Sequence, residues 1–415
     1  MTTSYRPDVP GAPTLTPAPP GASDAGVDER LVEAARQLAP LIRAHADEAE
    51  RERRIARPVL DALADAGLRR LFAPRAYGGL EADPVTCARA VEEIALADSA
   101  AGWAMQAGNT GAWWAARLPA EGAAELFAGG PEPIIAASFQ AMHRVTEVPG
   151  GYRFTGRGAL ASTVHDAQWV MMAGLVMDDG RPRMTEAGPE IVAVAMSTGD
   201  VEIVDSWHSL GMRGTDSNDV VADDVHVPAS RAFHMTPTFR PGPGYEGPLY
   251  RIPAVASVSV VVAPVALAIA RNAITALREL AQQKTAMGTM KTLRDRAVVQ
   301  ATLAEAEGIL RAARLLFYDE LAAAWRRAVA GETATLEQRA DLMLAGAHAA
   351  RSAARVADLM HRLGGTSGIY ARSPLERHFR DAQTVRHHGF LSDGRLETVG
   401  QVYLGVAPEF PLVAF

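Results

Sequence analysis

The sequence predicts an α+β protein with an N-terminal helical domain, a central β-domain and a C-terminal helical bundle. Three observations lead to this prediction. Apolar residues recur at helical spacing up to about residue 130 and again from residue 253 onward, whereas the stretch between contains short apolar runs broken by Gly, Asp and Pro. The chain has 415 residues, 48% of them hydrophobic, which is enough for a large core with more than one layer.

Residues 1–26 are expected to be disordered and to lie outside the fold. Met1 to Gly21 contain six prolines and no apolar stretch of the kind that a signal peptide needs. The N-terminal helical domain then spans residues 27–131. Pro84 follows an Ala-Asp pair and suits the first turn of a helix. Helices are predicted over residues 30–50, 58–67, 84–98 and 101–117.

The central β-domain spans residues 132–235. Its apolar runs are separated by turn signals such as Pro149-Gly150-Gly151 and Asp178-Asp179-Gly180. Strands are predicted over residues 152–154, 169–176, 191–196, 201–204 and 220–227.

The C-terminal helical bundle spans residues 236–415. Its first apolar run, from Ile252 to Ala270, contains two prolines and two serines, so it is interpreted as a buried core helix and not as a membrane span. A helix from Met343 to Leu363 should stop at Gly364-Gly365. Between them, one long helix has an apolar stripe that we expect to be buried and to contribute to subunit contacts: Val299, Leu303, Ala306, Leu310, Ala313, Phe317 and Leu321.

Charge and cysteine content narrow the possible partners and the compartment. The net charge is −7 and no basic stripe stands out, so no nucleic-acid partner is expected. Cys87 is the only cysteine, so no intrachain disulfide can form, and we expect it to be a small core residue on a helix. The chain is therefore expected to be cytoplasmic, with no membrane association.

Several motifs occur in the order typical of one family. Leu71 to Gly79 matches a "P-x-x-Y-G-G" loop, and Val220 to Pro228 ends with an acidic pair followed by a Val-Pro pattern. Gly364 to Gly368 are followed by Pro374 to Arg377 and then by Arg380-Asp381. Over roughly residues 27–410, the chain resembles the acyl-CoA dehydrogenase superfamily. The resemblance implies the acyl-CoA dehydrogenase fold, which has the same three-part order.

Within that family the chain is similar to the two-component flavin monooxygenases, which include the hydroxyphenylacetate hydroxylase oxygenase component and dibenzothiophene monooxygenase. Ala101 to Ala104 and Trp207 to Asp219 match this branch, and His388 lies seven residues after Asp381, where the branch has a histidine. The resemblance implies reduced flavin (FMNH2 or FADH2) as cofactor and O2 as co-substrate. It also implies a separate flavin reductase as partner, a homotetramer and a small-molecule substrate.

The residues available for proton abstraction favour an oxygenase over a dehydrogenase. A dehydrogenase needs a carboxylate base near the substrate α-carbon. The family has that Glu at one of two places, which here hold Gly389 and the acid-free segment from Ile252 to Ala263. Two alternatives stay open: an acyl-CoA dehydrogenase-type flavoenzyme with a displaced base, and a flavin-binding paralogue without turnover.

His388 is the predicted catalytic residue. In the branch that the chain resembles, reduced flavin and O2 give a hydroperoxide at flavin C4a, which survives only where water is excluded and its proton is controlled. An imidazole suits this task because histidine titrates near the working pH. The neighbouring His387 is the alternative, as is a purely structural histidine at a helix end. No metal site is expected, since His378, His387 and His388 form no i, i+4 pair with a matching carboxylate.

Further flavin contacts follow from the resemblance. Ser162 matches a hydroxyl beside the flavin N5 edge, Ser138 lies in a segment that resembles a flavin-facing loop, and Trp103 matches an aromatic residue beside the flavin ring. A histidine of some phenol-oxidising members is replaced here by Gly108 to Gly111. Indoles, polyketide-like aromatics, sulfur heterocycles and amino groups therefore remain candidate substrates.

A second set of residues resembles the family's contacts to the flavin phosphate. Lys284 and Met287 occupy the Arg and aromatic positions of an "R-x-x-F-G" motif, and Gly364-Gly365 resembles a turn that approaches the flavin of a neighbouring subunit. Lysine keeps the charge but loses the bidentate fork of arginine. We therefore expect flavin to be borrowed in its reduced form and not held permanently.

Overall fold

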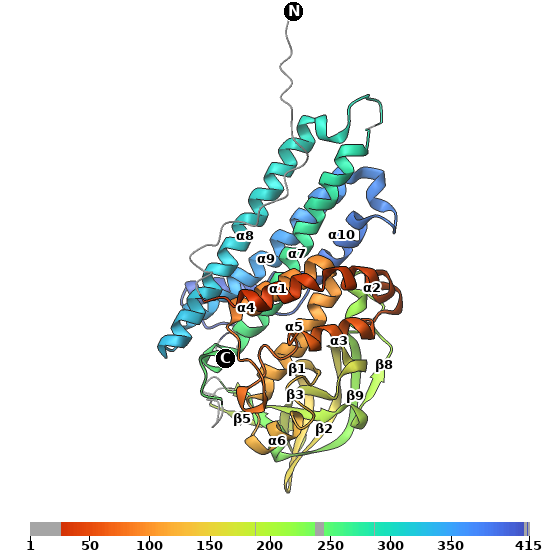
Figure 1. The fold of residues 1–415 in the computed structure, drawn as a ribbon. Helices are drawn as coiled ribbons and strands as arrows, with labels where there is room; N and C mark the ends of the chain where they lie inside the picture. The colour runs from red at the N-terminus through yellow and green to blue at the C-terminus, as the bar shows by residue number, and fades with distance from the viewer. Residues whose placement is uncertain (1–25, 187, 237–244, 286, 411–412, 414–415) are drawn as a thin grey trace, which may run out of the picture.

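The computed structural model describes residues 26–186, 188–236, 245–285, 287–410 and 413. The predicted disordered segment therefore lies outside the described residues, except for Gly26. The described chain has helices at both ends of the sequence and a large mixed sheet between them (Figure 1). This is the α+β order that the sequence predicts.

The first N-terminal helices lie together above the sheet, whereas the last of them lies beside the lower part of the sheet (Figure 1). The predicted helix over residues 30–50 is in fact two helices, because Pro40 lies in a first turn, where its missing N–H costs nothing. Asp28, Asp83 and Asp98 each cap a helix by accepting a backbone N–H. The helices are α1 (Glu29–Gln37), α2 (Ala39–Glu52), α3 (Arg57–Asp65), α4 (Pro84–Ala97), α5 (Ser99–Ala115) and α6 (Ala120–Leu126).

The central sheet has strand order β10-β7-β3-β1-β2-β9-β8, with β4 paired to β3, and β5 pairs separately with β6. Its first strand was not predicted from the sequence, because its polar and apolar residues do not alternate cleanly. The strands are β1 (Ile135–Val148), β2 (Gly151–Ala161), β3 (Trp169–Asp178), β4 (Arg181–Pro182), β5 (Met184–Thr185), β6 (Gly188–Pro189), β7 (Ile191–Ser197), β8 (Glu202–Val204), β9 (Asn218–Pro228) and β10 (Ala232–His234).

Ser138 lies inside β1 and not in a loop, which corrects the expectation for this segment. Strand β1 pairs in parallel with β3, and the register shifts between Ser138 and His143. Such an irregularity adds residues to one strand and bends it locally. Strand β1 also packs against α5.

The C-terminal helices include three long helices that run side by side, α7, α8 and α9 (Figure 1). The predicted apolar stripe is largely buried inside the chain, with Ala306, Ala313 and Phe317 fully covered. The stripe is therefore core and offers no free face to another subunit, which removes that reason for expecting a tetramer. The helices are α7 (Ala254–Gln283), α8 (Ala297–Ala330), α9 (Leu336–Gly364), α10 (Pro374–Val385) and α11 (Gly394–Tyr403).

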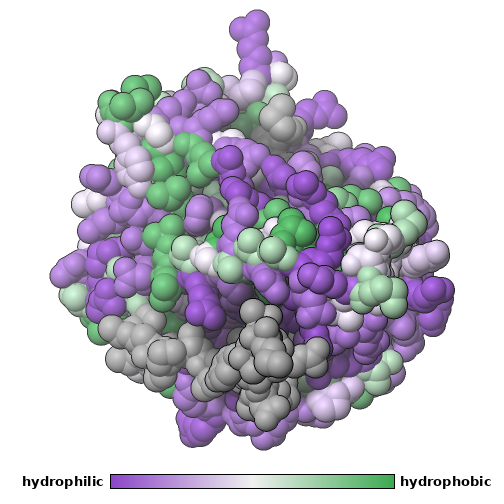
Figure 2. Space-filling model, turned by 90° about the horizontal axis from the view of Figure 1, so that it is seen from above, coloured by the Kyte–Doolittle hydropathy of each residue, from purple (hydrophilic) through white to green (hydrophobic). Residues whose placement is uncertain are grey.

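In the described part of the protein, apolar residues are buried mainly in the interior. No helix in the described part is long and apolar enough to cross a membrane. Cys87 is fully buried in α4, as expected for a small core residue. Seen end-on, the surface is mostly hydrophilic, with apolar side chains gathered in several small patches (Figure 2).

Helix α5 joins the two halves of the molecule. It packs against β1 on the sheet side and against α7 on the bundle side, while α10 packs against α7 and α9. These contacts bring the start of α5, the ends of two strands and the end of α10 to the same place. The candidate site lies at this junction.

Candidate active site

A cavity of about 500 Å³ lies where α5, β1, the end of β2 and the turn after α10 meet. Four of the eight residues predicted as functional line it: Trp103, Ser138, Ser162 and His388. These residues are up to 285 positions apart in the sequence, so only the fold brings them together. The volume is in the range of ordinary small-molecule sites. A more open hollow of about 960 Å³ lies between α2 and the start of α10 and contains none of the predicted residues.

The walls of the cavity are aromatic and uncharged. Among the described residues that line it, none is Asp, Glu, Lys or Arg. The polar groups come mainly from hydroxyls, from Gln106 and from two histidines. A carboxylate base of the kind a dehydrogenase needs is therefore absent from the described lining. Six aromatic side chains supply most of the remaining wall: Trp103, Trp114, Phe139, Trp207, Phe390 and Phe410.

His388 is held among aromatic rings. Its ring makes an edge contact with Trp103 at 5.4 Å between centroids and a tilted contact with Phe390 at 5.9 Å. Burial lowers the pKa of His388 to about 4, because the surroundings do not solvate a cation. The imidazole is therefore neutral near pH 7, which corrects the expectation that it titrates near the working pH.

The tautomer of His388 follows from its backbone contact. The Phe390 backbone N–H donates to Nδ1 of His388 at 3.4 Å, so Nδ1 accepts and the neutral ring has its proton on Nε2. His387 also lines the cavity but is exposed. The helix α10 ends at Val385, so both histidines lie in the turn that follows it.

A chain of hydroxyls connects the cavity wall to the backbone of a buried loop. The indole Nε1–H of Trp103 donates to Ser162 Oγ at 2.9 Å, and Ser162 Oγ lies 2.8 Å from Ser217 Oγ. Ser217 Oγ lies 2.7 Å from Thr215 Oγ1, which donates to the Met212 carbonyl at 2.9 Å. Ser217 and Thr215 are almost fully buried, at 4% and 1% exposed. Ser162 is thus part of a fixed network and not an isolated surface hydroxyl.

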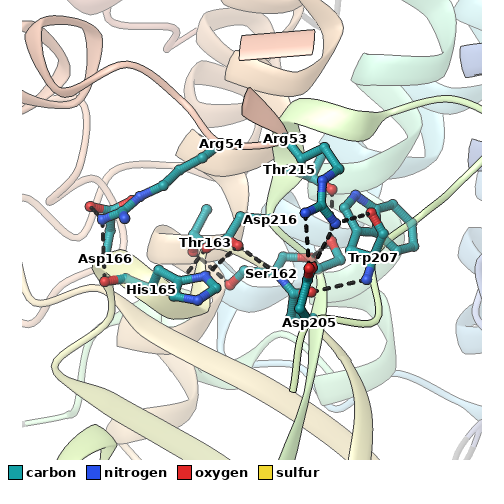
Figure 3. A network of polar contacts seen from close by, with 12 residues as sticks. Arg53, Arg54, Ser162, Thr163, His165, Asp166, Asp205, Trp207, Thr215 and Asp216 are labelled. Atoms are coloured by element: carbon teal, nitrogen blue, oxygen red, sulfur yellow. Dashed lines mark hydrogen bonds and ion pairs between the residues drawn. The ribbon is translucent and has the colours of Figure 1, made fainter. Parts of the chain in front are cut away.

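Two loops are held together around this chain (Figure 3). The Thr163 backbone N–H donates to the Thr215 carbonyl at 2.8 Å, which ties the end of β2 to the loop before β9. The Asp216 carboxylate accepts from the His165 backbone N–H at 2.9 Å and lies 2.7 Å from His165 Nδ1. These contacts make the hydroxyl positions rigid.

Backbone strain is concentrated beside the cavity. Eight described non-glycine residues have positive φ, and four of them border this region, with φ between 52° and 63°: Leu160, Thr163, Met212 and Asp216. A left-handed backbone costs a non-glycine residue free energy, and such residues gather at functional sites. The strain is consistent with loops shaped for binding.

Ser138 has less to offer a ligand than expected. It is 4% exposed, and its hydroxyl donates to the Ala159 carbonyl at 2.8 Å. Its single proton is therefore already used, and only an acceptor lone pair remains.

Asp381 connects three walls of the cavity. One carboxylate oxygen accepts the Met212 backbone N–H at 2.6 Å, and the other accepts the Ser99 hydroxyl at 2.5 Å. Ser99 begins α5 and Asp381 belongs to α10, so this buried carboxylate fixes the position of His388 relative to Trp103. The Arg-Asp motif was noticed in the sequence, but this joining role was not predicted. Thr215 and Ser217, within the Trp207–Asp219 motif, were likewise not singled out.

The other four predicted residues lie together at a different place. Lys284 Nζ donates to the Gly364 carbonyl at 2.6 Å, and Gly365 follows with φ +51°. Met287 is fully exposed in the same turn region. Val262, which lines the cavity, lies 22 positions before Lys284 on α7, so the two are about 33 Å apart along the helix at about 1.5 Å per residue.

In the described part of the chain, no group of three or more His, Cys, Asp or Glu side chains is arranged to hold a metal ion.

Comparison with known proteins gives consistent matches. Two family models match the chain, "Acyl-CoA dehydrogenase, N-terminal domain" over residues 28–119 and "Acyl-CoA dehydrogenase, C-terminal domain" over residues 260–393. Indole-3-acetate monooxygenase of Pseudomonas putida is 32% identical over 367 residues, which cover 88% of this chain and 91% of that protein.

Two further proteins extend the comparison. The oxygenase component of the FADH(2)-dependent resorcinol hydroxylase of Rhizobium sp. (strain MTP-10005) is 26% identical over 399 residues, covering 92% of this chain and 95% of that protein. The crystal structure of 3-HSA hydroxylase from Rhodococcus sp. RHA1 has a TM-score of 0.84 at 26% identity, covering 93% of this chain and 99% of that one. The chain therefore belongs to the acyl-CoA dehydrogenase superfamily, in its branch of flavin-dependent monooxygenase oxygenase components.

Proposed function

We propose that this chain binds reduced flavin supplied by a separate reductase and, with O2, oxygenates a small aromatic molecule. The observation that supports this most strongly is the cavity itself. It is aromatic, its described lining has no ionised side chain, and it brings His388 next to Trp103. The relatives named above are monooxygenases or hydroxylases of aromatic compounds, including indole-3-acetate and resorcinol.

The residues of the cavity fit a flavin ring. Flat aromatic walls suit a planar heterocycle, and the hydroxyl chain offers a fixed polar contact at Ser162. Reduced flavin, when bound, supplies the two electrons that let O2 donate one oxygen atom to the substrate. We assign Trp103 and Ser162 to flavin contact, with Ser138 as a secondary acceptor.

His388 has the properties of a neutral proton donor. Its lowered pKa keeps it uncharged, and its Nε2–H is the only proton it has to offer in that form. In a site that excludes water, a neutral N–H group can donate a hydrogen bond to an oxygen atom without transferring its proton to that atom. We assign His388 to controlling the proton at the reacting oxygen, with His387 as the exposed neighbour.

The substrate pocket should accept a neutral aromatic ring with a modest polar substituent. Gln106 and Thr110 lie one helical turn apart on α5 and both line the cavity. The Thr110 hydroxyl donates to the Gln106 backbone carbonyl at 2.9 Å and lies 3.2 Å from Gln106 Oε1, so the amide NH2 of Gln106 is the polar group that we expect a ligand to use. We therefore assign Gln106 to recognition of the substrate's polar group.

The distant second group of residues is best explained by a homo-oligomer. One flavin ring cannot touch both Ser162 and Lys284 of the same chain, because about 33 Å of α7 separate Lys284 from the cavity wall. A second copy can present its Lys284, Met287, Gly364 and Gly365 to the remote end of the flavin. Closed symmetric assemblies are the common way for two copies to complete such a site. We keep the tetramer as the expected state, and the cytoplasm as its location, where Cys87 stays reduced.

Single-turnover mixing tests the proposed activity. The protein is mixed anaerobically with chemically reduced FMN or FAD, and then with O2 and a panel of indoles and phenols. We expect one oxygenated product per bound flavin for at least one substrate class, with little free hydrogen peroxide. Bleaching of bound FAD by an acyl-CoA would instead support the dehydrogenase alternative. Flavin binding without product from any aromatic compound would support the non-catalytic alternative.

A further inference from the structure

Hydrogen-bond direction along the hydroxyl chain determines what Ser162 can offer the cavity. Thr215 has one hydroxyl proton and two neighbours, the Met212 carbonyl and Ser217. A carbonyl oxygen only accepts, so all contacts are satisfied together only if Thr215 donates to Met212. Ser217 must then donate to Thr215, and Ser162 must donate to Ser217.

At the cavity end, this direction leaves Ser162 without a free proton. Its proton goes to Ser217, and one of its lone pairs accepts the indole N–H of Trp103, which is only a donor. One acceptor lone pair remains. The wall therefore presents an acceptor at this point, although a serine could in principle present either a donor or an acceptor.

Reduced and oxidised flavin differ in whether N5 donates or accepts a hydrogen bond. Reduced flavin has an N5–H, which donates, whereas oxidised flavin has an N5 lone pair, which accepts. Two facing acceptors repel each other and leave a buried polar atom unpaired, whereas a donor facing an acceptor forms a hydrogen bond.

We propose that Thr215 and Ser217 are positioning residues that make the site selective for reduced flavin, by fixing Ser162 as an acceptor. This inference rests on the proposed flavin site and extends it to two residues that also line the cavity and that act through Ser162. The two residues are buried, and the loops around them are tied by Thr163 and Asp216, so the direction of the chain is built into the fold.

Two substitutions alter the chain of hydroxyls in different ways. Ser217→Ala removes the acceptor of the Ser162 proton, so Ser162 can turn this proton toward the cavity while keeping a lone pair for an N5–H. Oxidised flavin should then bind roughly tenfold more tightly, with reduced flavin almost unchanged, which is the effect expected for one hydrogen bond. Thr215→Val removes the hydroxyl that accepts the Ser217 proton, so the Ser217 hydroxyl turns and donates to Ser162. Reduced flavin should then bind more weakly and oxidised flavin more tightly.

The experiment measures the dissociation constants of oxidised and reduced flavin by anaerobic fluorescence titration, and the midpoint potential of bound flavin as an independent readout. Thr215→Ser keeps the hydroxyl and should restore the wild-type ratio of the two constants. Ser209→Ala is the matched control, since the Ser209 hydroxyl also donates to a backbone carbonyl, that of Gly211, at 2.8 Å, but lies outside the chain.

Each outcome is decisive. A fall in the ratio of oxidised to reduced dissociation constants in Ser217→Ala and Thr215→Val, but not in Thr215→Ser or Ser209→Ala, supports the inference. Equal changes in both constants would show a merely structural role and overturn it, as would a wild-type protein without preference. A wild-type protein that binds neither form of flavin would instead overturn the proposed function itself.

Discussion

The cavity and the far end of the helical bundle present their predicted flavin residues in opposite ways. Trp103, Ser162 and His388 are enclosed, hydrogen-bonded and packed against one another. Lys284 is partly buried and its Nζ donates to the Gly364 carbonyl, while the nearby Met287 is fully exposed. The enclosed group is organised before any ligand arrives, whereas the exposed group offers a surface that another molecule must cover. We therefore expect the cavity to act as the chemical site, and the far end of the bundle to need a second copy before it contacts flavin.

The largest expected effect tests the enclosed group. His388→Ala removes the neutral donor, and coupling of O2 use to product formation should fall by about 100- to 10,000-fold while reduced flavin still binds. His387→Ala, which alters an exposed ring, should be far milder. Product and hydrogen peroxide are quantified in single turnovers. Wild-type coupling in the His388 variant would remove its assigned role, and loss in the His387 variant alone would shift that role by one residue.

The second prediction concerns the anchor of the enclosed group. Asp381→Ala leaves the Met212 N–H and the Ser99 hydroxyl unpaired, and it removes a buried partner of Arg377. The free energy of unfolding should fall by about 3 kcal/mol in urea denaturation. Asp295→Ala, which removes exposed contacts with Arg294 and the Thr292 hydroxyl, should lower it far less. Equal losses in both variants would show that Asp381 has no special anchoring role.

The third prediction is a pH dependence that arises from two histidines of the α10 region, His388 in the cavity and His378 at the more open hollow. Burial lowers the pKa of both His388 and His378 to about 4, below the ordinary value of 6.5. The unfolded chain takes up protons first as pH falls, so their contribution to stability is fully present above pH 6.5 and is lost as pH falls through 4. By pH 5 the loss should be about 2 kcal/mol per histidine, because pH 5 lies about 1.5 pH units below the unfolded pKa and each unit is worth about 1.4 kcal/mol.

Urea denaturation from pH 7 to pH 5 measures this slope. His388→Gln keeps a polar side chain that does not titrate. The free energy of unfolding should therefore depend less on pH, by about the contribution of one histidine. An unchanged slope in this variant would mean that His388 takes up a proton in the folded protein as easily as in the unfolded one.

The smallest expected effect tests the exposed group. Lys284→Ala should weaken binding of reduced flavin by roughly tenfold, the size of one charge-assisted hydrogen bond, and the loss should grow as the protein is diluted below its association range. Lys291→Ala, in the same exposed turn region, should leave binding unchanged. Analytical ultracentrifugation and flavin titration are run on the same samples. A binding loss that is independent of protein concentration would contradict the two-copy arrangement.

The sequence predicted which residues lie at the cavity better than it predicted their chemical properties. The Trp103 and Ser162 motifs were found because residue type and order match a known family, and the structure brings both to one cavity. The pKa of His388 could not be read from the sequence, because it depends on burial against Trp103, which is 285 positions away in the chain, as well as on the neighbouring Phe390. The apolar stripe of α8 shows the same limit: its periodicity predicted burial correctly but could not say whether the covering partner is the same chain.

The sequence by itself determined the order of helices, sheet and helices, the family, and the absence of a carboxylate at both expected base positions. Periodicity and local motifs are sufficient for these conclusions, since both are properties of neighbouring residues. Only the tertiary structure decided that Ser162, Ser217 and Thr215 form one chain of hydroxyls, and that Lys284 lies far from it. Hydrogen-bond direction depends on how separate segments meet in space. The separation of Lys284 from the cavity depends on which residues of α7 line that cavity, and sequence spacing alone does not contain that information.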